Sequence, residues 1–241
     1  MSTLKATTIE PATGTNVTLG TTGDTVALPG NTLALDTWKD SGGNTLFTSN
    51  GSGVVSSVNS ALTGAGPVLI QSQTASGDST VSFTSGIDST YDKYMFVCTD
   101  INPATDNTDF VFLGSSDTGG SYGVDKTTTS WRAKHTEAGS SSFGYVTGYD
   151  HPPDGTEKQW LAYGIGNASD ESASGIFYIF APSSTTYVKQ FYSRFQWYGA
   201  SVESTDLFIA GYWNTTSVID AVQFKMTSGN FDGKISLYGV K

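Results

Sequence analysis

Residues 191–198 decide the fold class, because large apolar side chains recur at every second or fourth position: Phe191-Tyr192-Ser193-Arg194-Phe195-Gln196-Trp197-Tyr198. In an extended strand, successive side chains point to opposite faces. This alternation places three large apolar side chains on one face, which we predict faces a core: Phe191, Phe195 and Trp197. The other face carries Tyr192, Arg194, Gln196 and Tyr198.

Eleven more segments after residue 67 show short apolar or alternating runs separated by Gly, Pro, Asn and Ser. Such regular spacing of short strands, without a convincing helical period, is typical of an antiparallel sandwich or jelly roll. We therefore predict an all-β fold, an antiparallel, jelly-roll-like β-sandwich. With 186–198, its strands are expected near residues 68–73, 79–84, 93–99, 109–115, 130–135, 142–149, 159–165, 175–180, 206–213, 218–226 and 233–238.

Residues 175–180 differ from the other segments because they are apolar at nearly every position, Gly-Ile-Phe-Tyr-Ile-Phe. A strand with two apolar faces is expected either in the centre of a sheet or under a neighbouring subunit. The sequence leaves both interpretations open.

Aromatic residues mark a boundary near residue 67. Of 5 Trp, 12 Tyr and 13 Phe in the chain, Trp38 and Phe47 are the two that precede it. Since aromatic side chains supply much of the buried area of a core, the first 66 residues are not expected to build one alone. We predict two domains, an N-terminal arm and shaft over 1–66 and a sandwich head over 67–241.

Within the arm, short alternating runs recur at 16–20, 24–30 and 31–36, each closed by Gly, Pro, Asn or Asp. This pattern favours an extended, strand-repeat arm that shares its apolar edges with other chains, and the alternative is an unstructured linker. Further along, Val54, Val55, Val58, Ala61 and Leu62 are compatible with a short helix-like or stalk turn.

Composition excludes several classes of partner. Charged residues make up 14 % of the chain and the formal net charge is -10, without a cluster of Lys or Arg. Neither nucleic acid nor an anionic membrane surface is therefore an expected partner.

No early apolar run suits a signal peptide and no later one suits a membrane span, so we expect synthesis in a cytoplasm and no membrane insertion. The lone Cys98 lies in an apolar run and is expected to be a buried, unreactive thiol.

The sequence carries no local pattern for catalysis. Its 2 histidines, His135 and His151, lie at ligand spacing from neither another His nor a Cys, and nucleophile-elbow, P-loop and dinucleotide-binding motifs are lacking. We predict no cofactor, no metal site and no enzyme activity. A glycosidase stays open, because two carboxylates from distant strands leave no motif.

Two loops are richer in residues that bind ligands. Residues 149–155 join Tyr149, Asp150 and His151 to a stiff Pro-Pro turn, a set able to stack on a sugar ring and bond its hydroxyls. Residues 115–122 end in Tyr122 and form the second candidate. The alternative for both loops is an ordinary solvated turn.

Several segments resemble virion structural proteins of tailed bacteriophages, in particular the short fibre proteins of marine phages. Residues 87–97, 100–106 and 115–122 are similar to the opening of their β-sandwich head, and residues 228–241 to its closing strand. Residues 9–20 look like a docking segment shared by otherwise different virion proteins. Thr118 interrupts the Asp-Gly-Gly turn usual at that point, and 241 residues is short for a complete tail fibre.

The resemblance implies a location in the virion and a homotrimer, and it supplies no catalytic residues. The leading hypothesis is a tail fibre whose head contacts a glycan on the host cell. Its residues 1–40 would dock on another virion protein through Ile9, Pro11, Val17 and Leu19. The alternative is a capsid fibre or decoration protein attached to the phage head, and a third possibility is a polysaccharide depolymerase.

Overall fold

The computed structural model describes residues 37–40, 42–49, 52, 55–58, 66–153 and 158–241. The chain divides into two compact units, Met1–Gly64 and Ala65–Lys241. This division lies two residues before the boundary that the aromatic residues predict. The recurring runs at 16–36 lie outside the described residues.

The described part of the first unit is a small antiparallel sheet. Its strands are β1 (Thr37–Lys39), β2 (Thr45–Ser49) and β3 (Val55–Val58), in the order β1-β2-β3. The rings of Trp38 and Phe47 stack with centroids 5.7 Å apart, yet Trp38 is 42 % exposed.

The helix-like turn expected between Val54 and Leu62 is wrong for residues 55–58, which form β3. Val58 pairs with Phe47 across the sheet, and β-branched valine favours an extended backbone. Val54, Ala61 and Leu62 themselves lie outside the described residues.

The second unit is built from strands, and the part of it that the structure describes contains no helix. The predicted all-β antiparallel class is therefore confirmed, and each of the twelve predicted segments overlaps a strand. Among the described residues, no helix is long and apolar enough to cross a membrane. The strands are β4 (Val68–Asp78), β5 (Thr80–Phe83), β6 (Lys93–Pro103), β7 (Thr108–Ser115), β8 (Lys126–Thr136), β9 (Ser141–Tyr145), β10 (Gln159–Ile165), β11 (Ala173–Phe180), β12 (Lys189–Gly199), β13 (Glu203–Trp213), β14 (Ala221–Met226) and β15 (Phe231–Val240).

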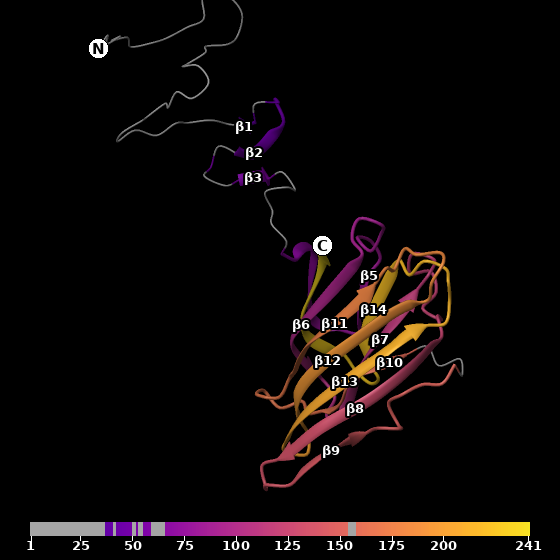
Figure 1. Ribbon diagram of the computed structural model, residues 1–241. Helices are drawn as coiled ribbons and strands as arrows, with labels where there is room; N and C mark the ends of the chain where they lie inside the picture. The colour runs from indigo at the N-terminus through magenta and orange to yellow at the C-terminus, as the bar shows by residue number, and fades with distance from the viewer. Residues whose placement is uncertain (1–36, 41, 50–51, 53–54, 59–65, 154–157) are drawn as a thin grey trace, which may run out of the picture. The chain divides into compact units, whose positions relative to one another are not determined.

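These strands form two packed layers (Figure 1). The larger layer has the order β4-β15-β6-β11-β12-β13-β8-β9 and the smaller one the order β10-β7-β14-β5, with antiparallel pairing throughout. They join at one corner, where Ile165 of β10 pairs with Gly199 of β12. The face of the larger layer that points away from the smaller one is called the outer face below.

The core between the layers is dominated by aromatic rings. Phe112 of the smaller layer lies 4.2 Å from Phe177 and 5.2 Å from Phe191 of the larger layer, measured between ring centroids. Phe195 and Trp197 are also buried, as the alternation in 191–198 predicts. Cys98 is buried in the same core, and this burial raises the pKa of its thiol, in agreement with the predicted unreactive side chain.

Strand β11 holds the segment with two apolar faces. It pairs with β6 on one side and β12 on the other, so the central-strand interpretation of residues 175–180 is correct. Phe177 and Ile179 point into the core. Ile176, Tyr178 and Phe180 therefore lie on the outer face, where Ile176 is 36 % exposed.

Candidate ligand-binding groove

The predicted loop residues Tyr149 and His151 are packed against strand β10. The Tyr149 ring stacks on Tyr163 with centroids 4.1 Å apart, and the His151 ring stacks on Trp160 at 5.1 Å. The Gln159 side chain donates a 2.8 Å hydrogen bond to the Tyr149 carbonyl. Both rings thus have protein partners on at least one face, which holds the loop in place.

The neighbouring Asp150 also has a partner within the protein. Its Oδ2 accepts a 2.6 Å hydrogen bond from the Tyr145 hydroxyl. Residues 154 and 155, the last two of this candidate loop, lie outside the described residues. The described part of this loop, residues 149–153, therefore makes the contacts of a surface loop that its own packing holds in place.

The environment of Tyr149 makes its ionisation a test of this packing. Burial, and secondarily the charge of Asp109, raises the pKa of Tyr149 to about 12, whereas an unfolded tyrosine ionises near pH 10. Between these values the unfolded chain releases a proton that the folded chain keeps, so stability falls as the pH rises. We expect Tyr149→Phe to lessen the fall in melting temperature between pH 10 and pH 12. An unchanged pH profile would contradict the buried phenol.

The second predicted loop, residues 115–122, is closed by its own hydrogen bonds. The Ser115 hydroxyl donates to Asp117 at 2.6 Å, and Asp117 also accepts from the backbone N–H of Ser121 at 2.8 Å. These bonds lower the pKa of Asp117. Tyr122 is half-buried beside Gly119, and among the described residues no hydrogen bond or ring contact joins it to Tyr149, Asp150 or His151. The predicted attachment residues Ile9, Pro11, Val17 and Leu19 lie outside the described residues.

A concave surface of another kind lies on the outer face of β11, β12 and β13. It is a depression of about 650 Å³ with an aromatic floor at one end and polar side chains across its middle and at the other end. Tyr178 of β11 lies opposite Tyr192 of β12, with ring centroids 4.9 Å apart. Tyr192 in turn stacks on Phe208 of β13 at 5.9 Å. Cross-strand ring pairs of this kind hold one another in place and keep the floor rigid.

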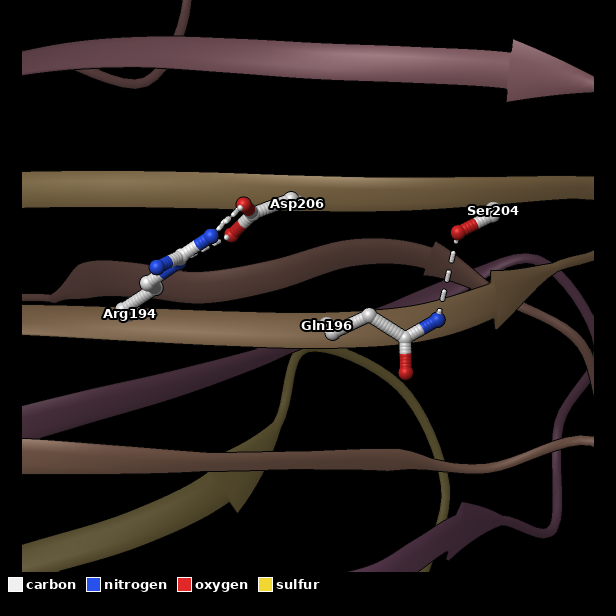
Figure 2. Close-up of polar contacts among 4 residues, drawn as sticks. All are labelled: Arg194, Gln196, Ser204 and Asp206. Atoms are coloured by element: carbon white, nitrogen blue, oxygen red, sulfur yellow. Dashed lines mark hydrogen bonds and ion pairs between the residues drawn. The ribbon is translucent and has the colours of Figure 1, made fainter.

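An ion pair crosses the middle of this depression (Figure 2). Arg194 donates from Nε to both carboxylate oxygens of Asp206, at 3.0 and 3.1 Å, and from Nη2 to Oδ2 at 2.6 Å. The residue directly opposite Asp206 is Gln196, so Arg194 reaches the carboxylate along the diagonal. The carboxylate raises the pKa of the Arg194 guanidinium.

The Arg194 side chain stays 69 % exposed, and its Nη1 makes no hydrogen bond to the described residues. Next to it, the Gln196 amide donates a 3.4 Å bond to the Ser204 hydroxyl, and Figure 2 shows its carbonyl oxygen pointing away from that bond. The pair and the amide thus present both donors and acceptors to solvent.

The depression continues toward the end of β8. A second hollow of about 280 Å³ shares Gln196 and Ser204 with the first and is further lined by His135, Glu137 and Tyr198. The Tyr198 hydroxyl donates to Glu137 at 3.4 Å. We call the two connected hollows the outer groove, with an aromatic end at Tyr178 and a polar end at Glu137.

Sequence reasoning placed Tyr192, Arg194, Gln196 and Tyr198 on one face but did not identify a site there. The missing information was the register of β12 against β13, which brings Asp206 and Phe208 beside them. Among the described residues, no group of three or more His, Cys, Asp or Glu side chains is arranged to hold a metal ion.

Comparison of the chain with protein-family models, with curated proteins and with solved structures finds no match. The function proposed below therefore depends on the residues and their geometry, together with the resemblance described above.

Proposed function

We propose that this chain is a non-enzymatic structural protein of a bacteriophage virion, a trimeric tail fibre whose sandwich unit binds glycan on the host cell. The observation that carries the proposal is the outer groove, an open surface with an aromatic floor and an exposed planar ion pair. Binding sites for polar organic ligands combine an apolar lining with a few well-placed polar groups.

The composition and the resemblance support the same function. A surface with few charges and many small polar residues is suited to contact with hydroxyl-rich ligands, and the net charge of -10 disfavours polyanions. In this proposal, residues 1–40 dock on another virion protein, and three copies raise a weak affinity at each site through avidity.

The geometry of Asp206 supports binding over hydrolysis. Both of its oxygens accept hydrogen bonds from Arg194, so the carboxylate is oriented as an acceptor in an ion pair. A glycosidase requires one carboxyl group that donates a proton and another that acts as base or nucleophile. The groove is therefore better suited to holding a glycan than to cleaving it.

The test uses particles of a phage whose genome encodes this chain. Antibodies against the chain should label the tail in electron micrographs, and the purified protein should have three times the 25.4 kDa mass of one chain by light scattering. Labelling at symmetric points over the capsid would overturn the tail-fibre function in favour of a decoration protein. A monomeric mass would overturn the trimer.

A further inference from the structure

We propose that the outer groove binds a neutral oligosaccharide, laid along β12, with the Arg194–Asp206 pair as its central polar contact. This inference rests on the proposed function and deepens it by naming the site and the class of glycan.

The shape of the groove suits an extended ligand. On β12 it runs from Tyr192 at the aromatic end to Tyr198 at the polar end. At roughly 3.3 Å per residue this stretch is about 20 Å long, which is enough for several linked sugar residues. Both hollows open to solvent and share Gln196 and Ser204, so one chain can contact the two together.

The polar groups suit adjacent hydroxyls. A sugar hydroxyl donates and accepts hydrogen bonds at once, and here Arg194 offers Nη1 as a donor beside the acceptor oxygens of Asp206. Gln196 adds a second planar group two residues along the same strand. Beside these groups, Ile176 is 36 % exposed and supplies apolar contact for the C–H face of a sugar ring. The Phe208 ring is stacked between Tyr192 and Trp131, so it adds its edge to this apolar surface.

The charge balance favours a neutral ligand over an acidic one. Arg194 is the one Lys or Arg that lines either hollow of the described groove, and its charge is balanced by Asp206. Glu137 adds negative charge at the polar end. A sulfated or uronic acid chain would meet this carboxylate at the polar end, at a cost typical of like-charge juxtaposition. Lys93, whose Nζ lies 5.9 Å from the centroid of the Tyr178 ring, lies at the opposite, aromatic end.

A protein partner is less well matched to the same surface. The centre of a protein–protein interface is depleted in charged residues, because their desolvation is costly. Here the exposed ion pair occupies the middle of the groove, between the aromatic end and the polar end.

Affinity electrophoresis of the full-length protein tests the inference. Native gels contain mannan, laminarin, arabinogalactan or dextran as neutral probes, and alginate or dextran sulfate as acidic ones. We expect retardation by at least one neutral polysaccharide and by neither acidic one. Retardation by the acidic probes alone, or by none of the six, would overturn the inference.

Two conservative variants connect binding to the groove. Arg194→Lys keeps the charge but loses the planar fork, and Asp206→Asn removes the charged acceptor. Each should raise the dissociation constant obtained from the retardation about tenfold, which is the loss of affinity expected for one or two hydrogen bonds to a charged group. Matched controls are Tyr187→Ala, at a tyrosine 71 % exposed outside the groove, and Asp232→Asn, and these should bind like the native chain. Equal binding by groove and control variants would overturn the inference.

Cell binding separates this inference from the proposed function. If the native protein binds host cells and Arg194→Lys binds them equally well, the groove assignment fails while the attachment function stands. If the native protein does not bind host cells, the attachment function fails even where a neutral polysaccharide retards it. A change in oligomeric mass in Arg194→Lys would instead make the groove a contact between subunits and overturn the inference.

Discussion

Phe112→Ala is expected to lower the free energy of unfolding of the sandwich unit by about 3 to 5 kcal/mol, the range for deleting a fully buried aromatic ring. Phe112 is 0 % exposed and lies between Phe177, Phe191 and Trp213, whose ring centroids are 4.2, 5.2 and 5.9 Å away. These rings cannot collapse into the space together, because each is held by further contacts in the core.

Urea unfolding of the full-length protein, followed by tryptophan fluorescence, measures this effect. The matched control is Phe143→Ala on β9, where the side chain is 74 % exposed and the expected change is within about 0.5 kcal/mol. Equal losses in the two variants would contradict the two-layer packing, because they would place both rings in equivalent surroundings.

Lys134→Met is expected to cost about 3 kcal/mol at neutral pH, the lower end of the range for breaking a buried ion pair. Lys134 pairs with Glu203, whose side chain is 8 % exposed, whereas that of Lys134 is 27 % exposed. Without the ammonium group, the Glu203 carboxylate stays desolvated beside an apolar side chain. The lost stability therefore comes more from the unpaired, desolvated charge of Glu203 than from the attraction within the pair.

A double-mutant cycle separates these two contributions. The double variant Lys134→Met/Glu203→Gln should be more stable than the sum of the single losses implies, because no unpaired charge is left. Asp206→Asn provides the comparison at the exposed pair with Arg194, where the expected cost is about 0 to 1 kcal/mol. Strictly additive losses at Lys134 and Glu203 would contradict a buried pair.

The positions of the strands could be predicted from the sequence more fully than their pairing. Period-2 patterns are local, so runs such as 159–165 could be recognised as strands without any knowledge of their neighbours. Pairing depends on distant residues. Strands β6 and β7 follow each other in the chain but belong to different layers. Nothing in the sequence of the turn between them distinguishes this crossing between layers from a hairpin within one layer.

The candidate site shows the same division between local and distant information. Tyr149 and His151 have side chains suited to binding, but Trp160 and Tyr163, more than eight residues later, pack against them. Arg194 and Asp206 are 12 residues apart and meet because a tight hairpin sets β12 against β13. Recognising that pair from sequence requires the register of the hairpin, which depends on where its turn begins and ends.

The pairing of β4 with β15 also determines the order in which the sandwich can fold. The Ser72 and Ser236 hydroxyls lie 2.9 Å apart across these strands, although 164 positions separate them in the chain. Closing so large a loop costs much entropy before any contact compensates, so folding is expected to be slow. During synthesis β4 emerges early and has no partner in its layer until β15 is made, so its edge stays open to other chains for most of translation.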